Sequence, residues 1–160
     1  MASGAAKAAA AGVLVLALAG LGLYLASAKP PPSRQATTLD LTYTGAAAQG
    51  NGAAAEGLAF SIPGCTIETA TIDFSVSLVG DNGVALSGQT VVVNVPDNDC
   101  TSRGTKEVVL TTDSNGAASG SATVAYITGT TSLTMSAAYA GGTVNGTYYE
   151  ASSTDTVVSL

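Results

Sequence analysis

The pattern of hydrophobic and polar positions divides the chain into one unbroken apolar segment and a long region of alternation. Residues 8–28 carry no charged side chain and are bounded by Lys7 and Lys29. As an α-helix, this segment would extend about 32 Å, close to the hydrocarbon thickness of a bilayer. We therefore expect one N-terminal hydrophobic α-helix within residues 1–28.

Small side chains recur along one stripe of this expected helix, in which Val15 is the bulky exception. A strip of small residues lets a second helix approach closely, which is how helices associate in the absence of water. The stripe therefore predicts a helix that packs against other helices, in lipid or in a protein core. Its helix-packing positions are Ala8, Gly12, Ala19, Gly22 and Ala26.

Three interpretations of residues 1–28 remain open. The segment is a secretory signal peptide cleaved after Ala26-Ser27-Ala28, an uncleaved membrane anchor, or the core helix of a filament subunit. Lys7 precedes the segment, whereas Lys29 and Arg34 follow it, so the basic residues do not select its orientation cleanly and are weakly biased against an exported C-terminal domain. Residues 29–36 contain three prolines and are expected to form a stiff spacer.

Alternation of apolar and polar residues begins at Thr37. Leu39, Leu41 and Tyr43 alternate with polar residues and predict a strand over residues 37–44. Residues 45–57, rich in Gly and Ala, have no period and are expected to form a flexible loop.

From Thr66 the alternation is continuous, and Ile72, Phe74, Val76 and Leu78 are expected to point inward. Tight turns are expected at 81–83 and 113–116, where Asn-Gly tolerates positive φ. Short strands at regular spacing predict an antiparallel β-sandwich over residues 37–160. The strands expected after residue 66 cover 71–78, 90–95 (ended by Pro96), 107–112, 118–127, 132–139, 143–149 and 154–158.

Composition narrows the classes of partner. Only 10% of residues are charged, the net charge is −6, and Arg103 and Lys106 are the only basic residues after Arg34. Nucleic-acid binding needs clustered Lys and Arg, so it is not expected. The abundance of Ser, Thr, Gly and Ala is typical of an extracellular β protein.

Cys65 and Cys100 follow an export-type segment and are therefore predicted to form a disulfide. The alternative is a pair of buried free thiols. Two cysteines without any histidine do not make a metal site, so neither a metal nor a cofactor is expected.

Other candidate chemistry has a simpler structural explanation in each case. Nucleophilic catalysis would need Lys106 as the base because the chain has no histidine; a solvated edge charge is the favoured interpretation, and no catalytic residue is expected. Asp97, Asp99 and Asp113 could bind calcium through loop oxygens, but turn chemistry already accounts for them.

Two surface features complete the candidate sites. Asn145-Gly146-Thr147 matches the N-glycosylation acceptor sequence, which makes Asn145 a candidate glycosylation site. Tyr139, Tyr148 and Tyr149 form either a binding patch or half-buried packing.

The run from Thr69 to Val158 resembles the bacterial Ig-like domain of the invasin and intimin type. The resemblance implies an Ig-like sandwich used as an extracellular stalk, spacer or adhesive module without catalytic residues. The loop at 97–103 with its cysteine and the addition at 37–64 depart from that family. The matching pieces are the strand 71–78, Asp81-Asn82-Gly83, Gly88, the strand 91–95, the run Thr-Thr-Asp-Ser-Asn-Gly-Ala-Ala at 111–118, Gly129-Thr130 and the strand 133–139.

The layout of a hydrophobic N-terminal helix before a β domain also resembles archaeal type IV pilins and archaellins. In that family the helices bundle into a filament core and Ig-like domains coat it. Lys7-Ala8 loosely resembles a prepilin processing site, although the helix is short and no glutamate follows the site.

These observations lead us to expect a non-enzymatic structural subunit of an extracellular, pilus-like filament on the cell surface. Its partners would be copies of itself, with the membrane before or instead of assembly. The alternative is a membrane-anchored or secreted Ig-like adhesion or virion-surface module. If cleavage follows Ala28, the strand 37–44 could complete a neighbouring domain by donor-strand addition.

Overall fold

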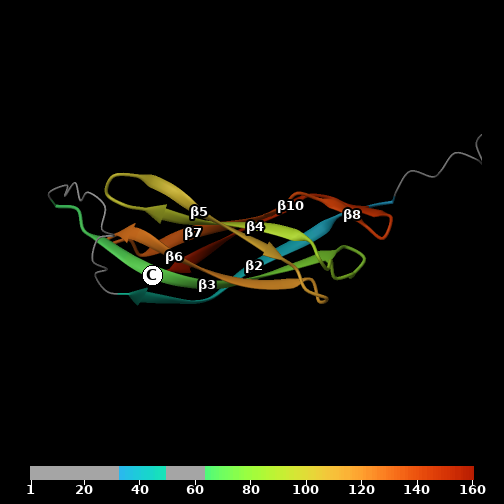
Figure 1. Cartoon of the computed structure of the whole chain (residues 1–160), viewed down its shortest axis with the longest axis horizontal. Coiled ribbons are helices and arrows are strands. Elements are labelled where there is room, and N and C mark those ends of the chain that lie inside the picture. The colour runs from blue at the N-terminus through green and yellow to red at the C-terminus, as the bar shows by residue number, and fades with distance from the viewer. Residues whose placement is uncertain (1–32, 50–63) are drawn as a thin grey trace, which may run out of the picture. The chain divides into compact units, whose positions relative to one another are not determined.

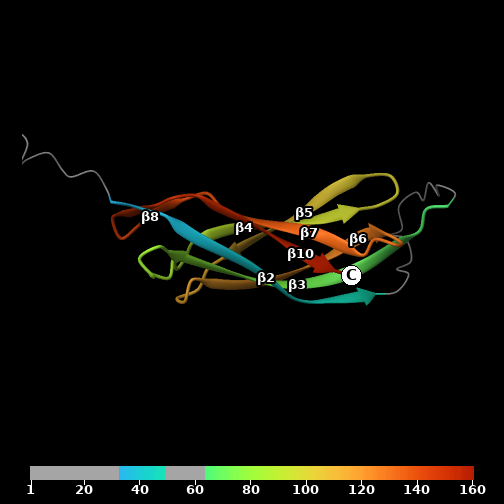
Figure 2. The same ribbon diagram turned by 180° about the vertical axis from the view of Figure 1, so that it is seen from behind.

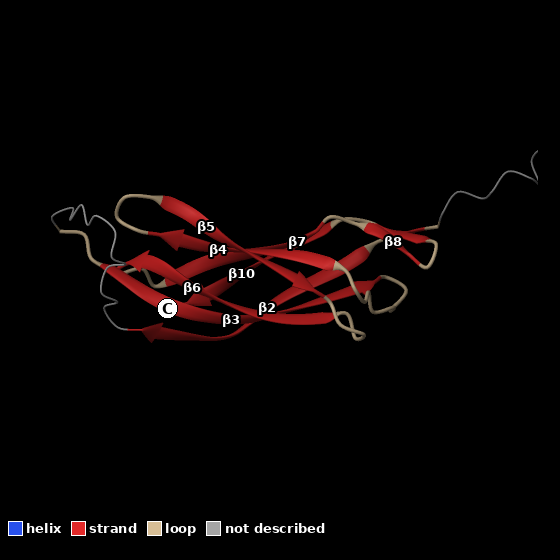
Figure 3. Ribbon diagram, in the orientation of Figure 1, coloured by secondary structure: helices blue, strands red, loops and turns tan. Residues whose placement is uncertain are grey.

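The computed structural model of the protein describes residues 33–49 and 64–160. The predicted hydrophobic helix and its packing positions lie outside these residues. Within the described ranges the chain is mostly β-strand, with antiparallel sheets and no helix (Figure 3). The mostly-β antiparallel prediction is therefore confirmed for this part of the chain.

Three sheets make up the folded unit, which begins at Ser33. One has the order β2-β3-β6 and a second the order β10-β7-β4-β5, both antiparallel; the third, β1-β9-β8, pairs β1 parallel to β9. Seen from opposite sides, the first two sheets form two layers (Figures 1 and 2). The strands are β1 (Arg34–Gln35), β2 (Thr37–Gln49), β3 (Ile67–Gly80), β4 (Thr90–Asn98), β5 (Arg103–Thr111), β6 (Ala117–Ile127), β7 (Ser132–Tyr139), β8 (Gly142–Val144), β9 (Thr147–Tyr149) and β10 (Ser152–Ser159).

The core lies between the two larger sheets. Period-two alternation puts every second side chain of a strand on one face, and burial of that face is the main favourable term in folding. The four β3 residues predicted to point inward are at most 2% exposed, as the alternation predicted. Across from them lie Val91, Val93 and Val95 of β4 and Met135 of β7 in the same buried cluster.

The predicted strand at 37–44 is present as the first half of β2. Leu39 and Leu41 are buried, and Tyr43 packs against the core. The strand pairs antiparallel with β3 of its own domain and continues to Gln49, so the predicted loop was wrong over 45–49. A register shift between Tyr43 and Gly45 interrupts the alternation, which hides the rest of the strand in the sequence. Residues 50–57 of that loop lie outside the described residues.

Pro96 does not end β4, contrary to the prediction. The strand runs on to Asn98, paired with β5, whereas its pairing with β7 ends at Asn94. Beyond Asn94 the β7 side of the ladder needs no N–H group, so a proline is tolerated there. The following strand, β5, accordingly begins at Arg103 rather than at Glu107.

The single strand predicted over 143–149 was also wrong. It is a hairpin, β8 and β9, with Val144 opposite Thr147 and a two-residue turn at Asn145 and Gly146. These two residues have φ of 49° and 81°, which Asn and Gly tolerate. The predicted turns at 81–83 and 113–116 are present.

The spacer predicted at 29–36 contributes its last residues to the folded unit. Arg34 and Gln35 form β1 beside β9, and the Asp81 N–H donates to the Ala36 carbonyl at 3.0 Å. A strand of two residues is too short to show the alternation of apolar and polar positions that would predict it from the sequence. The domain therefore holds the chain immediately after Pro32.

Candidate functional site

The disulfide candidates meet at one end of the two layers. Cys65 lies two residues before the start of β3, and Cys100 lies in the turn between β4 and β5. Their sulfurs are at bonding distance and their Cα atoms are 6.0 Å apart, as a bridge requires. The pair would join the β2-β3-β6 sheet to the β10-β7-β4-β5 sheet.

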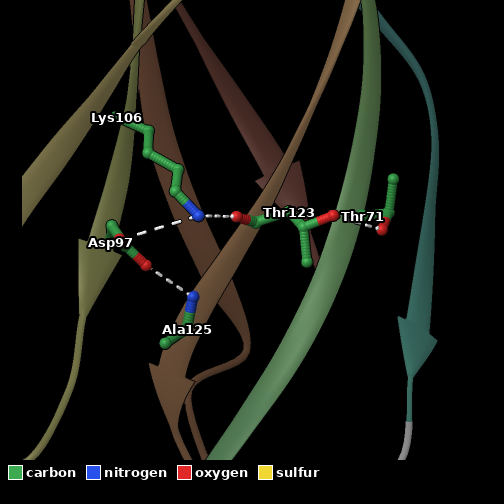
Figure 4. A network of polar contacts seen from close by, with 5 residues as sticks. All are labelled: Thr71, Asp97, Lys106, Thr123 and Ala125. Carbon is green, nitrogen blue, oxygen red and sulfur yellow. Dashed lines mark hydrogen bonds and ion pairs between the residues drawn. The ribbon is translucent and has the colours of Figure 1, made fainter. Parts of the chain in front are cut away.

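A polar network joins the same two sheets, from β4 and β5 of one sheet to β6 of the other (Figure 4). β6 is an edge strand, with β3 on one side and no strand of the described chain on the other. The Ala125 N–H on this edge donates to Asp97 Oδ1 of β4 at 2.7 Å. Lys106 Nζ of β5 donates to the Thr123 carbonyl and lies 3.9 Å from Asp97 Oδ2. We call Asp97 and Lys106 with these two β6 groups the edge latch.

The edge latch satisfies backbone groups that would otherwise stay unpaired. An exposed strand edge is a template for pairing with another chain, and charged residues placed on it are a common protection. The Thr71 and Thr123 hydroxyls, 2.9 Å apart, continue the contact from β6 to β3. Within residues 33–49 and 64–160, the partners of Lys106 in the latch are the Asp97 carboxylate and the Thr123 main-chain carbonyl.

A hollow of about 400 Å³ lies between β5 and the start of β6. Val109 is 58% exposed at its rim. Its lining residues are Val109, Leu110, Thr111, Asp113, Ala117, Ala118 and Ser119. Its lining mixes apolar side chains with two hydroxyls and the Asp113 carboxylate, whose Oδ1 is engaged in the turn.

The three aspartates considered as calcium ligands each bond to different groups of the protein. Asp97 belongs to the edge latch, and Asp99 Oδ1 accepts hydrogen bonds from both the N–H and hydroxyl groups of Thr101 and Ser102. These bonds lower the pKa of Asp99 from 3.8 to about 2, led by the Thr101 hydroxyl. Asp113 Oδ1 accepts from the N–H groups of Asn115 and Ala117, which lowers its pKa. Turn chemistry accounts for Asp99 and Asp113. Within residues 33–49 and 64–160, no group of three or more His, Cys, Asp or Glu side chains is placed to hold a metal ion.

Two of the three tyrosines are core residues. Tyr139 and Tyr149 are 3% and 4% exposed. Burial raises the pKa of Tyr139, with Tyr148 and Tyr149 adding to it, and its hydroxyl donates to Gln89 Oε1 at 3.2 Å. Tyr148 is half-buried, with the Arg34 guanidinium 5.8 Å from its ring centroid. Packing rather than an open binding patch describes this group.

Asn145 is exposed in the turn between β8 and β9. The sequence placed it within a strand, although the Asn-Gly pair is itself a hairpin signal. The edge latch was missed because Asp97 and Ala125 are 28 residues apart, and no local pattern links them.

No family model matches the chain, and no curated protein or solved structure matches it. In the part of the chain that the structure describes, no helix has the length and apolar character needed to cross a membrane.

Proposed function

We propose that this protein is a non-enzymatic structural subunit of an extracellular, pilus-like surface filament. Its N-terminal hydrophobic segments would pack together along their small residues, and its β domain would be exposed around them. Copies of the chain are its principal partners, with the membrane as the location of the segment before assembly.

The observation that carries the proposal is the position in the chain at which the folded domain begins. β1 pairs with β9 directly after Pro32, and the Tyr148 N–H donates to the Ser33 carbonyl at 3.0 Å. Only residues 29–32 then separate the hydrophobic segment from the domain, a reach of at most about 14 Å. Three of these residues are prolines, which stiffen the connection. A coat of domains close around packed helices needs such a short, stiff connection, whereas a tethered adhesion module does not.

The strand orders support the finer assignment of an Ig-like sandwich. In chain order, β2, β3 and β6 correspond to strands A, B and E on one sheet. The other sheet, β10-β7-β4-β5, corresponds to strands G, F, C and C′. This order agrees with the resemblance to bacterial Ig-like domains, which serve as stalks and spacers. β2 already completes its own domain, so donor-strand addition would require it to leave β3.

The test is to isolate surface material from the cells that make the protein, image it by negative stain, and measure the intact mass of the subunit. We expect filaments whose subunit retains residues 8–28. Filaments built from a subunit that begins at Lys29 would refute packing through the hydrophobic segment. A protein that is anchored in the membrane and never forms filaments would favour the adhesion or virion-surface module.

A further inference from the structure

The hairpin of β8 and β9 carries an acceptor sequence that a structural role does not require. Asn145-Gly146-Thr147 is the only Asn-x-Ser/Thr tripeptide in the sequence. The other Asn-Gly pairs of the chain are each followed by Ala or Val, as in Asn82-Gly83-Val84 and Asn115-Gly116-Ala117.

Turn geometry explains Asn145 and Gly146 but not Thr147. Both turn residues have positive φ, and Asn-Gly is the preferred pair for such a two-residue hairpin. Thr147 begins β9, where any strand-forming residue would serve. Among the described residues its hydroxyl has one long contact, 3.4 Å from the Ser33 hydroxyl. The threonine that completes the acceptor sequence therefore has no evident structural task.

The Asn145 carboxamide is open to solvent. Asn145 and Gly146 are both exposed, and a Cβ added at Gly146 would meet nothing within 4 Å. Within the described residues no hydrogen bond engages the Asn145 side chain. Asn82 differs, since its Oδ1 accepts from the Val84 N–H at 3.1 Å. A transferring enzyme and a bulky sugar can both be accommodated at this turn.

We propose that Asn145 is an N-glycosylation site, modified with an oligosaccharide from a lipid-phosphate-linked donor. In the transfer, Asn145 Nδ2 forms a bond to C1 of the first sugar while the bond from C1 to the phosphate oxygen breaks. The lipid phosphate leaves with the electron pair, and the proton from Nδ2 goes to a base of the transferring enzyme. This inference rests on the extracellular location in the proposed function, because such donors serve exported proteins.

The sugar would stand at the end of the domain where the spacer enters. Tyr148, three residues after Asn145, bonds Ser33 and pairs with Arg34. Glycosylation there would place the sugar at the turn between β8 and β9 of the small sheet.

The experiment compares the peptide 107–160, released by cleavage after Lys106, in four forms of the full chain made in its natural host. Wild type and Asn115→Asp should be heavier than the sequence mass by one oligosaccharide. Asn145→Asp, which keeps a residue that tolerates positive φ before Gly146, and Thr147→Val, which keeps the side-chain shape, should both lose that mass. Accessibility of the protein to an impermeant label on intact cells is measured in parallel.

A surface-labelled wild-type protein whose peptide has the sequence mass, or exceeds it only by the 1 Da of deamidation, would overturn glycosylation and leave the proposed function standing. Retention of the sugar in Thr147→Val would overturn it too, because the sugar would then lie on another residue. An unlabelled, unmodified protein would overturn both proposals together.

Discussion

At the scale of single residues, Asp97 does more in the edge latch than its ion pair suggests. The Lys106–Asp97 contact is 3.9 Å long and both side chains are partly exposed, so the ion pair itself is worth less than about 1 kcal/mol. The 2.7 Å bond from the Ala125 N–H to Asp97 instead satisfies a partly buried backbone donor. We expect Asp97→Ala to lower the free energy of unfolding by about 1–2 kcal/mol. Urea denaturation at neutral pH measures this.

The matched control for Asp97→Ala is Asp97→Asn, which removes the charge but keeps Oδ1 as an acceptor. We expect Asp97→Asn to cost clearly less than Asp97→Ala. Lys106→Met loses the hydrogen bond to the Thr123 carbonyl as well as the ion pair, so it should cost more than Asp97→Asn. Equal losses in Asp97→Ala and Asp97→Asn would show that charge, and not the hydrogen bond to Ala125, holds β4 on β6.

Asp99 gives the stability a defined dependence on pH. Its pKa is about 2 in the folded protein, below the ordinary 3.8, because Thr101 and Ser102 donate to the ionised carboxylate. A depressed folded pKa means stabilisation that is complete above pH 3.8 and lost as the pH falls through about 2.

The pH test compares wild type with Asp99→Asn, which cannot titrate. The difference between their free energies of unfolding should be constant above pH 3.8 and shrink as the pH approaches 2. Asp113, whose pKa is also lowered, is present in both proteins and cancels. A difference that stays unchanged down to pH 2 would contradict the role given to the Asp99 hydrogen bonds.

At this scale the sequence predicted local chemistry and missed long-range pairing. Asp99 and Asp113 bond to residues two to four positions away, so turn chemistry identified them in advance. Asp97 and Lys106 looked like loop and edge charges because their β6 partners are distant in the chain. Asp97 bonds to the other sheet, whereas Asp99 and Asp113 bond within their own turns. Which aspartate makes the distant bond depends on how the two sheets pack, and no local sequence pattern encodes that packing.

At the scale of elements, the Cys65–Cys100 pair closes a loop with a sequence separation of 35 between β3 and the β4–β5 turn. In the chain-entropy model such a bridge stabilises the fold by about 3–4 kcal/mol. We expect no reactive thiol in denatured, unreduced protein, and a free energy of unfolding lower by about that amount in Cys65→Ala/Cys100→Ala. Two reactive thiols per chain would exclude the bridge.

Elements were predictable where a single period ran undisturbed. β3 alternates from Ala70 to its end, and its inward residues from Ile72 to Leu78 were identified from the sequence alone. β2 was predicted only as far as its register shift, since the Gly and Ala residues beyond it have no contrast between faces. The β8–β9 hairpin was missed because Val144 and Tyr148 continue a strand-like composition across Asn145 and Gly146. The Asn-Gly pair that favours a hairpin turn was present, but it was interpreted only as part of a glycosylation sequence.

At the scale of the whole molecule, a mostly-β antiparallel fold followed from the number and spacing of alternating segments. The pairing order of the strands did not, because it depends on contacts such as β4 with β7, whose paired residues are 42 to 48 positions apart in the chain. The small sheet β1-β9-β8 was equally hidden. Its parallel pair brings Arg34 to Tyr148, and neither residue carries a local sign of the other.

The filament proposal depends on the stripe of small residues, which can be tested without altering the β domain. Replacing Gly12 and Gly22 by Leu should abolish assembly while leaving the domain folded. A Leu on this stripe of small residues pushes the axes of neighbouring helices apart. Dispersion contacts between the helices weaken sharply within about an ångström of added gap. A simple membrane tether would be unaffected, since lipid accommodates Leu as readily as Gly.

The control for Gly12→Leu/Gly22→Leu is Leu14→Ile with Leu21→Ile, which keeps the apolar volume and lies on a different stripe of the helix. Its effect should be mild whether the segment packs in a filament or only tethers the domain. Assembly is followed by sedimentation and negative-stain imaging of surface material, and the fold of the domain by its urea transition. Loss of filaments in Gly12→Leu/Gly22→Leu with an unchanged urea transition assigns assembly to close helix approach. Filaments that form as in wild type would remove the steric argument, and a module tethered or secreted through its N-terminal segment would then explain the same sequence better.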